Sequence, residues 1–224
     1  MSPLTAGEAY RLWAPNYSSE TAVSFLENKL VGEMTPPLDG LCLLDAGCGT
    51  GRRIRNAGPA KAVGLEVCPE MLAAGAAEGS FAGIDFVVGD VRQMPFDAGA
   101  FDVIWCRLVL GHLPEIANAY AELARVAHDS STLIVSDFHP AAVDAGHRRN
   151  FRLGDKVIEV EHHVHRVDDH IKSARAAGLE LRQVREAEIG NDVLPFYASA
   201  HRLEALAEHV GLPVVIAMAF GKVR

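Results

Sequence analysis

The stretch Leu43-Leu44-Asp45-Ala46-Gly47-Cys48-Gly49-Thr50-Gly51-Arg52 decides the fold class of this chain. Three glycines alternate with other residues directly after an apolar run, and glycine lets a backbone turn sharply or approach a ligand closely. The spacing is Gly-x-Gly-x-Gly rather than the Gly-x-Gly-x-x-Gly of dinucleotide sites, and no Gly-Lys-Ser/Thr of a phosphate loop follows. The acid two residues before the first glycine would oppose a pyrophosphate and suits a cationic amine. The stretch predicts a strand, a tight ligand-binding turn and a helix; a turn without a ligand is the alternative.

This turn lies in a series of short apolar runs separated by amphipathic stretches. The runs lack two-residue alternation, which is typical of strands covered on both faces, and they fall at 41–44, 62–65, 84–88, 101–105 and 132–135. Within residues 115–127, Tyr120 and Leu123 share one helical face. Repeated alternation of strand and helix requires right-handed crossovers, so we predict an α/β, doubly wound protein with a mainly parallel, Rossmann-like sheet.

The pattern changes after residue 136. A Gly154-Asp155 turn between β-prone pieces predicts a hairpin within 151–167, inserted after the fifth strand. Helices are expected at 168–177, with an acidic N-cap, and at 199–210. The apolar run 214–220 is too short to span a bilayer, and we expect it to pair inside the chain's own sheet.

The composition excludes several classes of protein. Of the 224 residues, 49% are hydrophobic and 22% are charged, which is typical of globular proteins and excludes disordered or fibrous chains. The formal net charge is −8 and the pI is near 5.7, so the backbone of a nucleic acid or an anionic membrane would be repelled. The small basic clusters at 52–55 and 148–152 do not reverse that balance.

The cysteines and the first residues indicate a reducing compartment. Cys42, Cys48, Cys68 and Cys106 show no Cys-x-x-Cys spacing, so we expect reduced, buried thiols rather than disulfides or a zinc site. The first ten residues lack the charged start and apolar core of a secretory signal. A cytoplasmic protein is therefore expected.

Four stretches of the chain resemble the motifs of class I S-adenosylmethionine-dependent methyltransferases. Residues 43–51 are similar to the first motif of that family almost letter for letter. Residues 63–72, in which Glu66 ends a strand, resemble the second motif, and residues 86–96 and 101–113 resemble the third and fourth. The order and spacing of the motifs also agree with the family, and none of them specifies the methyl acceptor.

Within this family, the chain looks most like the methyltransferases of ubiquinone and menaquinone biosynthesis. Members of that group also start with a Tyr-x-x-Trp-Ala-x-x-Tyr stretch, which is present here at 10–17. The chain departs from many relatives at Gly111-His112, where they carry His-His.

The resemblance implies one methyltransferase domain over residues 1–224, built on a seven-stranded sheet. No repeat, low-complexity tract or composition shift marks a linker. We expect residues 1–35 to form a helical cap interrupted at Pro15, and residues 36–137 to form the cofactor-binding core. Residues 138–224 would supply an acceptor-side insert and the C-terminal strands.

The resemblance further implies S-adenosylmethionine as the cofactor and S-adenosylhomocysteine as the product. Glu66 would accept hydrogen bonds from both ribose hydroxyls, because a carboxylate offers two oxygens, and Asp90 would accept from the adenine amine. Asp45 would either contact the cofactor's amino group or support the loop from behind, and Tyr17 would either reach the cofactor carboxylate or pack on the first helix. The other implied cofactor contacts are Gly47, Cys48, Gly49, Gly51, Arg52, Val67, Met71, Val91, Cys106 and Arg107.

The methyl acceptor is expected beyond the carboxyl ends of the strands. His112 and His139 are the candidate catalytic residues, because they are the titratable groups best placed to take a proton from it. Alternatively, His112 caps a helix, His139 orients a loop, and in-line transfer proceeds without a residue base. Aromatic rings in the flanking segments, Phe196 and Tyr197 among them, favour an apolar or aromatic acceptor. The acceptor-side residues are Tyr10, Trp13, His112, Phe138, His139 and His165.

The run Glu161-His162-His163-Val164-His165-Arg166 suggests a metal site. On a strand, His163 and His165 would share a face and could join Glu161 as ligands. The simpler interpretation is a polar strand that borders the pocket. We expect that strand and no metal, with His165-Arg166 lining or supporting the acceptor pocket.

Transfer of a methyl group from S-adenosylmethionine to a small molecule, by in-line displacement, is the predicted activity. The first alternative is a non-catalytic module that binds S-adenosylmethionine as a sensor or scaffold. A nicotinamide-dependent oxidoreductase is disfavoured by the glycine spacing and by the lack of a Tyr-x-x-x-Lys pair. A protein or RNA substrate is disfavoured because the chain is acidic and compact.

Overall fold

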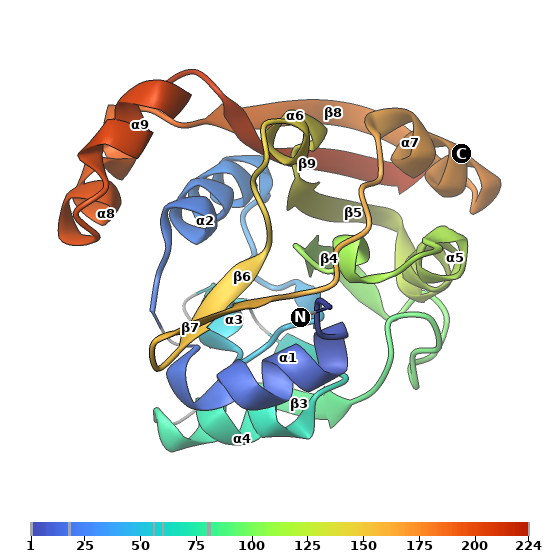
Figure 1. Ribbon diagram of the computed structural model, residues 1–224. Helices are drawn as coiled ribbons and strands as arrows, with labels where there is room; N and C mark the ends of the chain where they lie inside the picture. The colour runs from blue at the N-terminus through green and yellow to red at the C-terminus, as the bar shows by residue number, and fades with distance from the viewer. Residues whose placement is uncertain (1, 18, 56, 60, 80–81, 224) are drawn as a thin grey trace.

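The computed structural model describes residues 2–17, 19–55, 57–59, 61–79 and 82–223. A seven-stranded sheet with the strand order β3-β2-β1-β4-β5-β9-β8 forms its centre (Figure 1). The five strands from β3 to β5 pair in parallel, and β9 runs antiparallel to both β5 and β8. The bounds are β1 Cys42–Ala46, β2 Lys61–Glu66, β3 Ile84–Val88, β4 Phe101–Arg107, β5 Ala127–Phe138, β8 Leu179–Glu188 and β9 Pro213–Lys222. The predicted doubly wound, mainly parallel fold is confirmed, and so is the pairing of the C-terminal apolar run inside the sheet.

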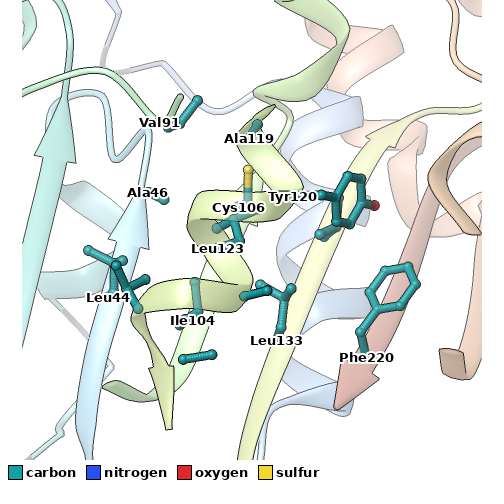
Figure 2. Close-up of a cluster of buried hydrophobic side chains, with 14 of the residues drawn as sticks. Leu44, Ala46, Val91, Ile104, Cys106, Ala119, Tyr120, Leu123, Leu133 and Phe220 are labelled. Carbon is teal, nitrogen blue, oxygen red and sulfur yellow. The ribbon is translucent and has the colours of Figure 1, made fainter. Parts of the chain in front are cut away.

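Helices cover both faces of the sheet because successive strand residues point to opposite sides. Leu44 packs in one cluster with Tyr120 and Leu123 of α5, as Figure 2 shows. Leu43, its neighbour, packs in a second cluster with Leu30 of α2. The helices are α1 Ala6–Trp13, α2 Ala22–Met34, α3 Arg52–Arg55, α4 Pro69–Ala77, α5 Ala117–Val126, α6 Pro140–Asp144, α7 Val167–Ala176, α8 Leu194–Ser199 and α9 Leu203–His209, with short 3-10 turns η1 Ala14–Asn16, η2 Leu110–His112 and η3 Asn191–Val193.

The first 35 residues divide between two roles. The helix α1 ends at Trp13, and Pro15 lies in the 3-10 turn η1, because proline cannot donate to the preceding helical turn. This part lies against α4 and the hairpin strand β6. In contrast, α2 packs on the sheet through its apolar face, and its first residues, 22–24, also line the cavity described below.

The predicted hairpin after the fifth strand is confirmed as β6 Asn150–Leu153 and β7 Lys156–Glu159. Gly154 takes a φ of +59° in its turn, a left-handed conformation that glycine adopts without strain. The chain after this hairpin is tied to the N-terminal segment: the Leu4 amide donates to the Glu159 carbonyl at 2.9 Å, and the Glu161 amide donates to the Leu4 carbonyl at 2.7 Å.

Three predicted boundaries differ from the structure. The helix expected from Asp168 begins at Val167, and its acids occupy the first turn: Asp169 accepts from the Arg166 amide at 2.9 Å. The helix expected over 199–210 is the shorter α9, Leu203–His209, and a separate helix, α8, precedes it at Leu194–Ser199. The strand expected at 132–135 is longer, because β5 begins at Ala127, directly after α5.

The order of the strands reverses between β1 and β4, which are neighbours in the sheet. The chain runs outward through β2 and β3 and then crosses to β4 on the other side. At such a switch point the loops after the two strands separate and leave a crevice at their carboxyl ends. Within the described residues, none of the helices has the length and apolar character needed to cross a membrane.

Candidate cofactor and acceptor site

A cavity of about 1360 Å³ opens at the carboxyl ends of the parallel strands. The glycine loop and the ends of β2, β3 and β4 form one side of it, and α1, the hairpin region and α8–α9 form the other. Of the cofactor residues predicted from sequence, those that line it are Tyr17, Gly47, Cys48, Gly49, Arg52, Glu66, Val67, Met71, Asp90, Val91 and Arg107. Of the acceptor-side residues, those that line it are Tyr10, Trp13, His112 and Phe138.

The glycine loop forms a cradle that has no room for side chains. Gly47, Gly49 and Gly51 all have positive φ, of 84°, 60° and 73°. A Cβ at Gly47 would lie 2.3 Å from Cγ2 of Val109, and one at Gly49 would lie 3.3 Å from Cε of Met71. The amides of Gly47 and Cys48 both donate to the carbonyl of Leu65, at 2.7 and 2.9 Å, which fixes the loop against β2. These residues therefore fit a ligand that approaches the backbone closely.

Glu66 stands at the end of β2 and lines the cavity. Its two oxygens accept from the amides of Gly49 and Cys68, each at 2.9 Å. Burial raises the pKa of Glu66, and these backbone donors partly offset the rise. Because a carboxylate has about four acceptor positions, one on each oxygen remains for a pair of ribose hydroxyls.

Asp90 lies after β3 and is engaged by its neighbour Arg92. The guanidinium donates to both carboxylate oxygens, with Nη2 2.6 Å from Oδ2 and Nε 3.0 Å from Oδ1, and the Arg92 amide donates at 2.8 Å. These hydrogen bonds hold the pKa of Asp90 below its usual value. An adenine amine would share this carboxylate with the guanidinium.

A buried charged cluster lies beneath the loop, and sequence reasoning did not anticipate it. Glu27 of α2 is fully buried and accepts from Nε and Nη2 of Arg107 at 2.9 and 2.8 Å. Arg53 approaches the same carboxylate at 3.1 Å, and the Ser136 hydroxyl donates to it at 2.7 Å. Burial alone would raise the pKa of Glu27, but Arg53 and Arg107 lower it to about 2. One feature of the sequence could have indicated this buried cluster: Glu27 is an acid on the same helical face as the buried Leu30 and Met34.

Asp45 lies behind the loop, is 1% exposed and is not among the residues that line the cavity. Burial raises its pKa to about 6, against the opposing charges of Arg107 and Arg53. Its Oδ2 atom is buried and has no hydrogen-bond partner among the described residues. A buried acceptor without a donor, beside a cradle closed to side chains, fits the ammonium group of S-adenosylmethionine.

His112 is held by two neighbours. Its Nε2 atom lies 2.7 Å from Nη1 of Arg149 and 2.9 Å from the hydroxyl of Tyr10. A guanidinium can only donate, so Nε2 is an acceptor and the imidazole carries its proton on Nδ1. Burial and then the charge of Arg149 lower the pKa of His112 well below its usual value. The imidazole is neutral, and the lone pair that a general base needs is directed at Arg149.

Arg149 is the functional residue that the sequence indicated least. It is 7% exposed, comes from the insert, and also donates to the Leu108 carbonyl at 2.7 Å. Leu108 has a φ of +57°, an uncommon conformation for a residue with a Cβ, directly after β4. The guanidinium lies 4.8 Å from the ring centroid of Phe138. In the sequence, Arg149 was only part of a small basic cluster.

His139 and His165, predicted to contact the acceptor, lie outside the set of described residues that line the cavity. Nδ1 of His139 accepts from the Ala141 amide at 3.1 Å and so caps α6, while its Nε2 lies 3.3 Å from Glu186. Nε2 of His165 lies 2.8 Å from the Leu113 carbonyl, which places this ring under the loop after β4. Both side chains therefore make hydrogen bonds that hold neighbouring segments of the chain in place. Gly51 and the fully buried Cys106 are also outside that lining set.

The histidine-rich run at 161–166 is not the strand expected from the sequence, and it packs instead as an extended segment against the turn after β4. The His163 amide donates to the Gly111 carbonyl at 2.8 Å, and the His162 ring takes the space beside Gly111, where a Cβ would lie 2.5 Å from Nε2 of that ring. Nε2 of His162 also lies 3.8 Å from Oδ1 of Asp137. In the part of the chain that the structure describes, no group of three or more His, Cys, Asp or Glu side chains is arranged to hold a metal ion.

The acceptor side of the cavity is rich in aromatic rings. Trp13 stacks on Phe151 of the hairpin with ring centroids 4.8 Å apart, and its ring meets Tyr17 edge-on at 4.9 Å. All six rings expected near the acceptor line the cavity: Tyr10, Trp13, Tyr17, Phe138, Phe196 and Tyr197.

Many known proteins with similar sequences or folds are methyltransferases, although one solved structure of similar fold (TM-score 0.66, 20% identity, covering 100% of this chain and 98% of the other) is the [4+2]-cyclase SpnF. A family model described as a methyltransferase domain matches residues 44–135. The chain is 27% identical over 201 residues to 27-O-demethylrifamycin SV methyltransferase of Amycolatopsis mediterranei, which covers 84% of this chain and 71% of that protein. It is 34% identical over 111 residues to malonyl-[acyl-carrier protein] O-methyltransferase of Herminiimonas arsenicoxydans, covering 47% of this chain and 40% of the relative. The solved structure of an S-adenosylmethionine-dependent methyltransferase from Mesorhizobium loti aligns with a TM-score of 0.65 at 20% identity, covering 87% of this chain and 97% of the other.

The glycine cradle, the fold and these relatives agree with the family predicted from the four motifs. The chain is a class I S-adenosylmethionine-dependent methyltransferase, and S-adenosylmethionine is its cofactor. The narrower resemblance to the ubiquinone and menaquinone enzymes stays a prediction.

Proposed function

We propose that this methyltransferase acts on a small molecule with an apolar or aromatic body. The observation that carries the proposal is the wall of six aromatic rings on the cavity that also contains the glycine cradle and Glu66. Flat rings exclude water and contact an aromatic acceptor over a large area. The name of the rifamycin relative, an enzyme that methylates a natural product, also supports a small acceptor.

For the cofactor, we assign each part of the site by its chemistry. Glu66 would accept from the ribose hydroxyls through the oxygens that Gly49 and Cys68 already orient. Asp90 would accept from the adenine amine, with the exposed Val67 and the buried Met71 packing on the flat faces. S-adenosylmethionine supplies a methyl group on a sulfonium, which is already activated toward a nucleophile and leaves as S-adenosylhomocysteine.

For the transfer itself, the chain's contribution is to orient the acceptor and to exclude water. His112 offers no free lone pair while Arg149 donates to it, and His139 caps a helix. Neither ring is therefore assigned as the general base in this arrangement. Alignment of the acceptor atom with the methyl group supplies the rate advantage, because it replaces a bimolecular encounter with a fixed approach.

We further propose that the enzyme works in the cytoplasm and binds neither nucleic acid nor membranes. The net charge of −8 supports this, since it opposes phosphate-rich surfaces.

Calorimetric titration with S-adenosylmethionine, S-adenosylhomocysteine and NADH tests the cofactor half of the site. We expect binding of the first two and none of the third. A mass-spectrometric search for a 14-Da increase in aromatic and quinone-like compounds then tests the acceptor. Acceptors confined to sugars or amino acids without an apolar body would contradict the proposal.

A further inference from the structure

One lobe of the cavity is basic although the protein as a whole is acidic. Two segments border it: residues 145–150, which connect α6 to β6, and residues 196–209 of α8 and α9. Besides Arg149, which donates to His112 and Asp137, the basic side chains of these segments that line the cavity, called the basic lobe below, are His147, Arg148, Arg202 and His209. Every residue of these two segments is described, and none that lines the cavity is a carboxylate. The whole chain has 29 acids against 21 lysines and arginines, so an excess of basic side chains on this part of the cavity indicates a site for an anion.

The two guanidiniums of the basic lobe keep donors available. Arg148 uses Nη1 to donate to the carbonyls of Val143 and His147, at 2.9 and 2.8 Å, and its other nitrogens make no hydrogen bond to another described residue. Arg202 is exposed, and no carboxylate of the described residues pairs with it. The nearby acid Asp144 faces Arg166 instead, at 3.9 Å.

Two histidine rings lie beside these guanidiniums. The rings of His147 and His209 meet edge-on with centroids 4.8 Å apart. Burial, and then the charges of His209 and Arg202, lower the pKa of His147. The lowered pKa favours the neutral form of His147, so the positive charge of the lobe comes from Arg148 and Arg202, and no carboxylate among the described residues of the two segments lines the cavity beside them to cancel it.

Aromatic rings adjoin the basic lobe. Phe196 and Tyr197 come from the same segment as Arg202 and line the same cavity, and Phe196 is backed by Phe25 at 5.5 Å. Aromatic rings can pack against an apolar ring of a ligand, and the guanidiniums of Arg148 and Arg202 beside them can donate to a negatively charged group on that ring.

We propose that the acceptor carries an anionic group (carboxylate, phosphate or sulfate) on its aromatic or apolar body, and that Arg148 and Arg202 bind this group. This inference rests on the proposed function, because the bound anion is a methyl acceptor only if the chain methylates small molecules. Binding of an aromatic anion to the basic lobe does not require the cofactor. It can therefore be measured separately from methyl transfer.

Two fluorescent probes of matched shape provide the test. 1-Anilinonaphthalene-8-sulfonate carries a sulfonate, and N-phenyl-1-naphthylamine has the same rings without it. We expect the native protein to bind the sulfonate about tenfold more tightly, because charge-assisted hydrogen bonds to a desolvated anion are strong. The R148Q/R202Q double variant should lose about tenfold in affinity for the sulfonate and leave the affinity for the neutral probe within about twofold.

The R175Q/R182Q double variant on α7 and β8 is the matched control, since both arginines lie outside the cavity lining and their loss removes the same two charges. Equal binding of both probes by the native protein would overturn the proposal. Equal losses in the double variant and in the control would also overturn it, because the sulfonate would then be sensing net charge. Calorimetry with S-adenosylhomocysteine on the same samples distinguishes the failure of this inference from the failure of the proposed function. If the cofactor product still binds but the sulfonate is not preferred, the methyltransferase assignment holds and only the anion-binding role of the basic lobe is refuted.

Discussion

Arg149 donates to Nε2 of His112 at 2.7 Å and thereby joins the insert after β5 to the turn after β4. This one contact fixes the tautomer of the imidazole, occupies its lone pair and places a positive charge beside it. A histidine that sequence alone suggests as a base is therefore a neutral, oriented part of the acceptor wall.

Replacing Arg149 tests that assignment. Arg149→Ala should raise the pKa of His112 toward its usual value, because the neighbouring cation is removed while burial remains. It should also cost about 2 kcal/mol of stability, because the Leu108 carbonyl and His112 each lose a charged donor. An NMR titration of the histidine rings and urea unfolding measure the two effects. Arg152→Ala on the exposed side of the hairpin is the control, and an unchanged His112 titration in Arg149→Ala would refute the role of the guanidinium.

Glu66 should be required for cofactor affinity. Glu66→Gln keeps the shape but replaces one acceptor oxygen by a donor, so it should weaken S-adenosylhomocysteine binding by roughly tenfold or more. Asp85→Asn, an exposed acid of β3, gives the same charge change away from the cavity. Calorimetry on both variants decides the point: equal affinities would remove Glu66 from the ribose site.

Glu27 should carry much of the stability of the layer beneath the loop. Glu27→Gln leaves the buried Arg107 and the nearby Arg53 without their carboxylate and should cost about 3 kcal/mol. Glu33→Gln, on the same helix but in an exposed pair with Arg185, should change stability by less than about 1 kcal/mol.

The pH dependence of Glu27 has a definite sign. A pKa lowered from 4.5 to about 2 gives stability that is present above pH 4.5 and is lost as the pH falls toward 2. Urea unfolding of the native protein and of Glu27→Gln across that window should converge at the acid end. Parallel curves would show that Glu27 does not titrate as the structure indicates.

Asp45 should act in the opposite direction. Its pKa is raised from 3.8 to about 6, so its contribution to stability is present below pH 3.8 and is lost as the pH rises through 6. Asp45→Asn should therefore be more stable than the native protein at pH 8, on the order of 2 kcal/mol, and should bind S-adenosylmethionine more weakly. Thermal unfolding at pH 4 and pH 8, together with calorimetry, measures both. A variant that is less stable at pH 8 would contradict the assignment of a strained, buried charge.

Gly111 should tolerate a side chain only if His162 is removed. Gly111→Ala places its Cβ 2.5 Å from Nε2 of His162, so it should lose about 1–3 kcal/mol of stability through overpacking. His162→Ala should recover part of that loss in the double variant, because Oδ1 of Asp137, 2.8 Å from the same Cβ, still crowds it. Gly32→Ala, with open space around it in α2, is the control and should stabilise slightly. Additive losses in the double variant would show that the two residues do not compete for space.

The fold and the cofactor half of the site followed from the sequence because their signals are local. The Gly47-Cys48-Gly49 loop, the acid at the end of β2 and the apolar strands are each read within a few residues. The acceptor side depends on contacts between distant segments, such as Arg149 with His112 or Trp13 with Phe151, and no local pattern encodes them. The sequence likewise did not decide between a catalytic role for His139 and the role that the structure shows, in which its ring caps α6.

Leu4 is hydrogen-bonded to residues 159 and 161, so α1 is seated on a part of the chain more than 150 residues away. On the ribosome, α1 emerges before α4 and long before the hairpin, so it can first pack against α4 and gains its second docking surface only when the hairpin has been synthesised. The stacking of Trp13 on Phe151 is consequently formed late, after the parallel strands have been synthesised. The acceptor side of the cavity is therefore completed only when a late segment of the chain reaches one of its early helices.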